Sequence, residues 1–344
     1  MTSITPLQRE RYDSLNGLRA LAAIGIVMMH VQANINLKPD LGFFTSWIIP
    51  FFTDFTLLFM LLSAFSMCCG YYERVKNGLI TPNAFYKRRY QRIFPFFAFL
   101  VAIDFVTEPS WGTFCEAFAD LTLCFNFLNA DIHVIGVGWF LGTIFVFYLL
   151  FPFFVFLMDN KKRAWISTTL VSLMCYIAIN YFKVLARSNI LYSSPFFIIG
   201  GLIYLYRKEI IAIAEKHYKV CLTFSILITL GYFLTRMSNT FFHNIAEVIL
   251  FSVWTVYAIA KKNVVLGNKV MKFLSGISME IYLCHMMFYR VVEKMHLENF
   301  ISNNNILYFI ELILVLIGAI FFSYIVKYYC FPFVGKGLSK LRAK

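Results

Sequence analysis

Two residues in the first apolar stretch of the chain could do chemistry. Arg19 and His30 lie in NGLRALAAIGIVMMHVQANI, residues 16–35. On an α-helix their separation corresponds to about three turns and a rise of ~16.5 Å, so both side chains share one face. An ionisable group at such depth usually faces the bundle interior or a water-filled path. An imidazole with an ordinary pKa near ~6.5 is a natural general base at neutral pH. We therefore predict a stripe from a cationic entrance at Arg19 to a base at His30; the alternatives are an interfacial anchor and a neutral buried imidazole.

Further polar residues lie at compatible depths in other apolar stretches. Asp54 or Glu280 could orient His30, as the carboxylate of a catalytic triad orients its histidine. His285 is the second candidate, either as a partner of His30 or as a ligand of an acceptor sugar. Each has a simpler alternative, because carboxylates near span ends often lie in headgroup water and tryptophan is common at the membrane interface. The predicted catalytic set is Arg19, His30, Asp54, Glu280 and His285, with Ser63 and Trp139 as substrate-binding residues.

A basic stretch, FYKRRYQRIFPFF at residues 85–97, precedes the third apolar segment. Guanidinium groups bind phosphates well because their planar forks make paired, charge-assisted hydrogen bonds. The alternative is the ordinary excess of positive charge on the cytoplasmic side of a membrane protein. The candidate phosphate-binding residues are Lys87, Arg88, Arg89 and Arg92.

The composition indicates the elements that must position these residues. Of the 344 residues 60% are hydrophobic, 14% are charged and forty are phenylalanine, more apolar surface than one soluble core can bury. We predict an all-α polytopic membrane protein whose spans each need about 20 residues. The ten predicted spans are 18–36, 47–70, 93–107, 137–158, 164–182, 190–206, 219–235, 244–260, 273–290 and 306–330.

Charge fixes the expected orientation of these spans. Most of the 31 lysines and arginines fall in alternate loops, on the side that holds both ends of the chain, so both termini are predicted to be cytoplasmic. The net charge of +13 then reflects a basic inner face beside anionic lipid and requires no nucleic-acid partner. The eight cysteines show no metal-type CxxC spacing, and we expect no metal. A single membrane domain is predicted over residues 1–344, with short tails at 1–17 and 331–344 and no separate soluble domain.

Five segments in order give the chain a recognisable pattern. They are LRALAAIGIVMMH at the first span, TDFTLLFMLLSAF at 53–65, FYKRRYQRIFP at 85–95, GWFLGTIFVFYLLFP at 138–152 and SMEIYLCHMMF at 278–288. Together they resemble the membrane acyltransferase-3 family over residues 12–330. Two positions depart from the usual family pattern: Ala64 stands in a glycine place of the second span, and Ile144 stands where many members have glutamate.

The resemblance implies a multi-pass O-acyltransferase of the cell membrane, which we expect to be the bacterial cytoplasmic membrane. Such an enzyme would move an acyl group, usually acetyl from acetyl-CoA, to a hydroxyl of a surface polysaccharide or lipid-linked sugar. His30 matches the family's essential histidine and Arg19 its partner arginine. Arg89 and Arg92 match positions associated with the phosphates of CoA. The expected partners are thus membrane lipid, acyl-CoA and a glycan acceptor.

Two other classes of function fit the pattern of buried charge. A transporter or flippase of a sugar or lipid-linked oligosaccharide also has many spans with charged residues at depth. An envelope scaffold would make the polar stripe purely structural. The sequence leaves open the acceptor, the acyl group, the choice between a covalent acyl-enzyme and direct transfer, and the oligomeric state.

Overall fold

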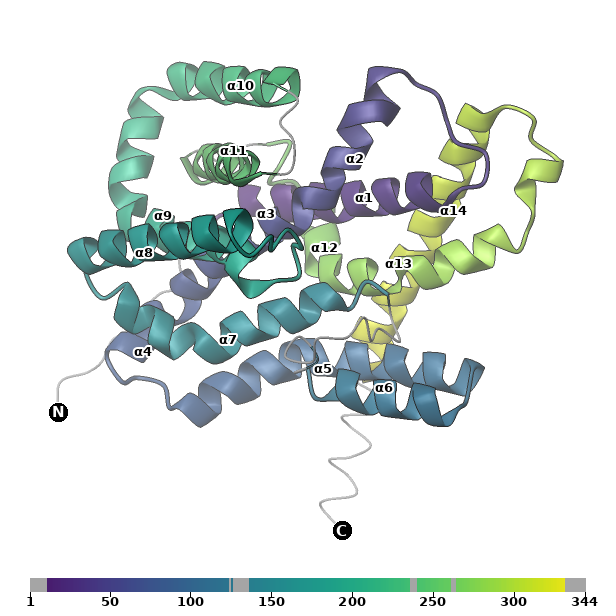
Figure 1. Ribbon diagram of the computed structural model, residues 1–344, viewed down its shortest axis with the longest axis horizontal. Coiled ribbons are helices and arrows are strands. Elements are labelled where there is room, and N and C mark those ends of the chain that lie inside the picture. Colours follow the sequence, from purple (N-terminus) through teal and green to yellow (C-terminus); the bar gives the residue numbers. More distant parts are fainter. Residues whose placement is uncertain (1–10, 124, 126–135, 236–239, 261–263, 332–344) are drawn as a thin grey trace, which may run out of the picture. The chain divides into compact units, whose positions relative to one another are not determined.

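The computed structural model describes residues 11–123, 125, 136–235, 240–260 and 264–331. Within these residues the chain is helical and contains no strand (Figure 1). Helices suit a membrane because each one satisfies its backbone hydrogen bonds within its own segment. The prediction of an all-α chain is confirmed for the described residues.

Seven helical segments of the described chain are long and apolar enough to cross a membrane. Nine of the ten predicted spans fall on one helical segment each, whereas the ninth, 273–290, covers the end of α12 (Lys269–Gly276) and most of α13 (Ser278–Glu293). Three of the helices concerned are not among the seven: α8 (Lys161–Asn180), α9 (Ile190–Lys216) and α13. The count of ten and the cytoplasmic termini therefore stay predictions. The seven segments are α1 (Ser14–Asn34), Phe44–Lys76, α5 (Pro82–Thr107), α7 (Trp139–Leu157), α10 (Tyr218–Thr235), α11 (Phe241–Ala260) and Asn304–Cys330.

The third predicted span was too short at its beginning. Residue 93 was expected to start it, whereas α5 begins at Pro82 and continues through Pro95. Proline is favourable in the first turn of a helix, and spanning helices tolerate an internal proline when neighbouring groups satisfy the freed backbone. The basic stretch at 85–97 is therefore helical, which fixes the directions of its arginines.

The described chain folds as two compact units, each built from separate stretches. The first comprises residues up to 18, 57–85 and 149–268; the second comprises 19–56, 86–148 and 269 onward. Four of the boundaries fall within helices: α1, α3 (Phe55–Met67), α5 and α7. The prediction of one membrane domain stays a prediction.

In the first unit α9 packs against α8 and α11, and α10 packs against α11. Asn160 and Asn189 cap α8 and α9, since their side chains accept hydrogen bonds from the backbone N–H groups of Arg163 and Leu191. The unit also contains α3 (Phe55–Met67), η3 (Cys68–Tyr72) and α4 (Glu73–Lys76).

Ala64 on α3 faces a glycine of α9. A Cβ atom on Gly200 would lie 2.8 Å from the Cβ of Ala64 and closer still to the carbonyl oxygen of Leu61. Small residues allow helix backbones to approach in this way. Ala64 is therefore accommodated because its neighbour on α9 has no side chain.

In the second unit α13 packs along α14 (Asn304–Ile325), as Figure 1 shows. Cys284 of α13 contacts Ser323 and the carbonyl oxygen of Ala319. Tyr308 of α14 donates a hydrogen bond to the carbonyl oxygen of Met28 on α1, at 3.1 Å. The shorter helices are η1 (Phe44–Ile48), α2 (Ile49–Phe51), η2 (Phe52–Asp54), α6 (Trp111–Leu121), α12 (Lys269–Gly276), η5 (Leu297–Asn299) and η6 (Val326–Cys330).

Candidate active site

The second unit brings two histidines together from distant parts of the chain. His30 lies on α1 and His285 on α13, and their ring centroids are 5.0 Å apart with an interplanar angle of 46°. His285 is fully buried, whereas His30 is partly exposed. Of the two residues, His30 is therefore the one that a substrate can reach.

The tautomer of His285 follows from its surroundings. Its Nδ1 lies 2.6 Å from the carbonyl oxygen of Tyr282. A carbonyl only accepts hydrogen bonds, so in the neutral ring Nδ1 carries the proton and Nε2 keeps a lone pair. That Nε2 is buried and makes no hydrogen bond with the described atoms. His285 thus presents a fixed acceptor.

Tyr282 is itself anchored, which keeps its carbonyl in place. Its hydroxyl donates a hydrogen bond to the carbonyl oxygen of Val137, at 2.8 Å, and its ring packs edge-on against Phe140. The orientation of His285 is therefore fixed by the residue one turn before it on the same helix. A second group that fixes the tautomer and direction of a histidine is common where that histidine handles protons.

The proximity of the two rings limits their charge. Two imidazolium ions at this distance repel, so protonation of one disfavours protonation of the other. Nε2 of His285 accepts no hydrogen bond from His30 in this arrangement, so one of the rings would have to turn before it could orient the other.

Glu280 has different partners from those predicted. The Lys327 ammonium donates a hydrogen bond to its Oε1 at 2.6 Å, and Arg92 Nη1 lies 3.5 Å from the same oxygen. Among the described residues both partners of Glu280 are cations and neither is a histidine. The structure thus shows Glu280 paired with Lys327 and Arg92, and its expected role in orienting His30 stays a prediction. Lys327 also donates to the carbonyl oxygen of Gly276.

The basic stretch of α5 does not present one surface. Arg88, Arg89 and Arg92 occupy adjoining positions around the helix, whereas Lys87 lies roughly 140° away from Arg92. The Arg89 guanidinium lies 5.8 Å from the ring centroid of Tyr148, a geometry compatible with a cation–π contact. Three arginines can therefore act together on one anion, and Lys87 is the least suited to join them.

The remaining predicted residues divide between the two units. Arg19 lies on α1 with His30, and because α1 is unbroken the two side chains keep one face. Asp54 ends η2, and Trp139 begins α7 in edge contact with Phe140. All three belong to the second unit, whereas Ser63 on α3 belongs to the first. The structure does not test a role for Ser63 in this site.

Two ion pairs of the second unit were missed by the sequence analysis. Lys327 was counted only as a cytoplasmic charge, although it stands in the apolar segment SYIVKYYCF. Asp104 lies in the apolar segment LVAIDFV and pairs with Arg290 at 3.7 Å. A charge within an apolar run was the available signal, because such a charge needs a partner from another helix.

Comparison with known proteins gives one broad match and one partial relative. Residues 12–328 match the sequence model of the acyltransferase-3 family, described as an acyltransferase domain. A curated protein of Rhizobium radiobacter, protein 2 in picA locus, is 30% identical over 94 residues, which are 27% of this chain and 44% of that protein. The chain thus matches less than half the length of this relative. No solved structure matches.

Proposed function

The chain belongs to the acyltransferase-3 family, and from this premise we propose that it transfers acetyl from acetyl-CoA to a hydroxyl of a cell-surface polysaccharide or lipid-linked sugar. The family makes it an acyltransferase, and its apolar helices make it a multi-pass membrane protein. The donor, the acceptor and the bacterial cytoplasmic membrane are parts of the proposal.

The observation that carries the proposal is the pair of histidines, 5.0 Å apart. His30 accepts the proton of the acceptor hydroxyl while the oxygen attacks the thioester carbonyl carbon. The carbon–sulfur bond then breaks, and the proton passes from His30 to the departing sulfur. An ester and free CoA thiol are formed and His30 is neutral again, so no metal and no covalent acyl-enzyme are required.

His285 acts in this scheme as a positioning residue. After a rotation that brings the two rings into hydrogen-bond contact, its Nε2 lone pair would accept an N–H from His30 and so direct the other nitrogen of His30 toward the acceptor. Because His285 donates its own Nδ1 proton to the Tyr282 carbonyl, it keeps this direction throughout the reaction. It takes the place that Glu280 was expected to fill, and Asp54 stays a second candidate.

The phosphates of CoA bind at the cytoplasmic side in this proposal. Arg88, Arg89 and Arg92 form the cationic face of α5, and Arg19 meets the thioester arm on its way to His30. The ~16.5 Å of helix between Arg19 and His30 separates the charged head of the donor from its reactive end. A buried transfer site also protects the acyl group from hydrolysis.

The test is transfer of labelled acetyl by membranes that contain the protein. Wild type, His30→Ala and Arg19→Ala are incubated with radiolabelled acetyl-CoA and cell-envelope glycan, and base-labile label is counted. We expect label with wild type and loss of at least ~100-fold in the His30 variant. His296→Ala is the matched control, because this histidine is exposed in a loop and its ring nitrogen faces Glu298.

The result also separates the enzyme from its alternative. The family match does not favour a transporter, and a transporter would leave no base-labile label with acetyl-CoA or with a succinyl-CoA control. Full label in the His30 variant, at normal protein level, would refute the role of His30 without refuting transfer itself.

A further inference from the structure

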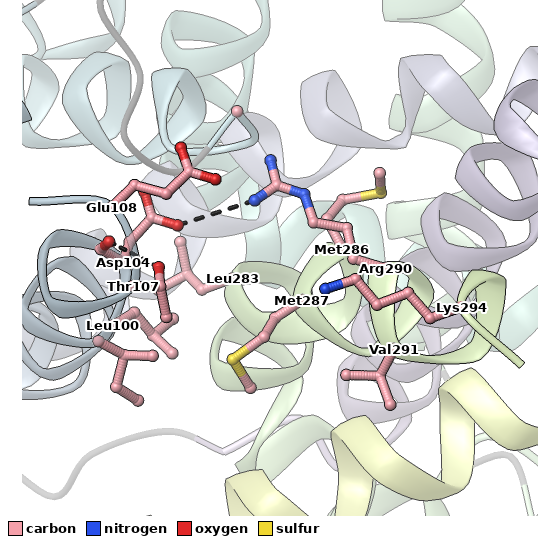
Figure 2. Close-up of a pocket in the computed structure, with 12 residues that line it drawn as sticks. Leu100, Asp104, Thr107, Glu108, Leu283, Met286, Met287, Arg290, Val291 and Lys294 are labelled. Atoms are coloured by element: carbon pink, nitrogen blue, oxygen red, sulfur yellow. Dashed lines mark hydrogen bonds and ion pairs between the residues drawn. The ribbon is translucent and has the colours of Figure 1, made fainter.

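A pocket of about 260 Å³ lies between the C-terminal ends of α5 and α13 (Figure 2). Both helices belong to the second unit. The candidate span of α5 ends at Thr107, and the polar residues of the pocket begin at this end. A pocket in this place lies where a span leaves the hydrocarbon and meets the lipid headgroups.

Four charges line this pocket, two of each sign. Asp104 lies on α5 and Glu108 directly follows that helix, whereas Arg290 lies on α13 and Lys294 directly follows it. Asp104 and Arg290 form an ion pair at 3.7 Å. The side chains of Glu108 and Lys294 have no hydrogen-bond or ion-pair partner among the described residues, and the Lys294 ammonium points toward α5 (Figure 2). One negative and one positive group are therefore available to a ligand.

The rest of the lining is apolar and adaptable. Leu100, Leu283 and Met287 contribute to it. Methionine is flexible and polarisable, so it adjusts to irregular apolar partners. The pocket thus combines a charged part that contains both signs with an apolar part.

This pocket is separate from the histidine pair. Leu283, Met287, Arg290 and Lys294 recur on one face of α13, whereas His285 lies roughly 200° around the helix from Leu283. A ligand in the pocket would have the full thickness of α13 between itself and the His285 ring. The pocket therefore does not serve the transfer step directly.

We propose that the pocket binds the head group and upper acyl chain of a zwitterionic aminophospholipid. The lipid phosphate pairs with Lys294 and Arg290, because both are cations with several donors. The lipid ammonium pairs with Glu108 and Asp104, and the first methylenes lie against Leu100, Leu283 and Met287. The volume is smaller than the ~300–1,000 Å³ of sites for drug-sized ligands, which suits one head group.

The balance of charge favours this lipid over an anionic one. An anionic lipid without an ammonium group would bring its phosphate to the two cations but would leave Glu108 beside a second negative charge. A free sugar would use the polar groups and leave the apolar residues exposed. The site does not depend on the proposed transferase activity, because it lies on the other face of α13.

Binding is measured on the purified full chain in detergent. Phosphatidylethanolamine and phosphatidylglycerol are added separately, and bound lipid is counted by native mass spectrometry, with the midpoint of thermal unfolding as a second readout. We expect wild type to bind phosphatidylethanolamine at least several-fold more tightly. Equal or weaker binding of phosphatidylethanolamine, or binding of neither lipid, would overturn the proposal.

Glu108→Gln gives a readout that misfolding cannot imitate. This variant keeps Arg290 and Lys294 but lacks one negative charge, so it should bind phosphatidylglycerol more tightly than wild type does. Lys294→Gln should weaken binding of both lipids. The matched control is Glu215→Gln with Lys216→Gln, which removes the same two charges from exposed positions of α9. An unchanged preference in Glu108→Gln, or a changed one in the control, would contradict the assignment.

Discussion

Lys327 places its ammonium 2.6 Å from the carboxylate of Glu280, across 47 residues of sequence. The carboxylate is buried and the ammonium is largely buried. This contact connects η6, which follows α14, to the first turn of α13, the helix that carries His285. Arg92 Nη1 lies 3.5 Å from the same carboxylate oxygen, so Arg92 is also a member of this ion cluster.

Removing one member of this ion cluster should destabilise the protein. Lys327→Met leaves the buried charge of Glu280 with Arg92 alone, and the loss of one partner of a buried pair costs about 3–5 kcal/mol. The double variant Lys327→Met with Glu280→Gln should recover much of this loss, because no unpaired charge remains. A double-mutant cycle on thermal unfolding in detergent measures the coupling, and additive effects would refute it.

The arginines of α5 should govern the apparent affinity for the donor. A charge-assisted hydrogen bond is worth about 1.5–3 kcal/mol, so Arg88→Ala or Arg92→Ala should raise KM for acetyl-CoA by roughly 10- to 100-fold. Arg92→Lys keeps the charge but loses the planar guanidinium fork, so its KM for acetyl-CoA should lie between those of wild type and Arg92→Ala. Lys208→Ala, an exposed lysine of α9, is the control. A change in kcat alone would argue against phosphate binding.

The two histidines should behave as one unit in catalysis. General base catalysis contributes about 10²–10⁴-fold, and residues that act together are not additive. His285→Ala should therefore lower the rate strongly, and the double variant with His30→Ala should be no worse than the poorer single variant. Rates of labelled acetyl transfer test this. Losses that multiply in the double variant would show independent roles.

Gly200 should not tolerate a side chain. Gly200→Ala places a methyl group against the Leu61 carbonyl and 2.8 Å from the Cβ of Ala64, and overpacking of this kind costs about 1–3 kcal/mol. Adding Ala64→Gly should restore part of the stability, because one of the two contacts is relieved. The midpoint of thermal unfolding is the measurement. Gly231→Ala is the control, since nothing lies within 4 Å of its would-be Cβ.

The contact between Lys76 and Asp159 should respond to acid. The hydrogen bond and charge of Lys76, whose Nζ lies 3.2 Å from Asp159 Oδ1, hold the pKa of that carboxyl below its usual value. A depressed folded pKa means that the stabilisation is complete above the unfolded pKa of ~3.9 and is lost as pH falls through the folded pKa. Backbone amides near residues 76 and 159 should be better protected from hydrogen exchange in wild type than in Asp159→Asn at pH 7. This difference between wild type and variant should shrink near pH 3. Equal protection in the variant and wild type at pH 7 would contradict this.

The sequence by itself determined the class of the protein. Apolar length and the requirement for internally satisfied backbone groups give an all-α membrane chain. Five short motifs in order identified the family over nearly the same residues that its sequence model matches. The common face of Arg19 and His30 also followed from sequence, because positions along one helix are fixed by 3.6 residues per turn.

The tertiary structure decided which charges meet. His30 and His285 are far apart in the chain, and nothing in their spacing predicts rings 5.0 Å apart. Glu280 was predicted as a partner of His30, and the structure shows it paired with Lys327 of η6 and Arg92 of α5. From the sequence alone, a charge in an apolar segment predicts only that it needs a partner. Its identity depends on how separate helices pack, which helical periodicity does not encode.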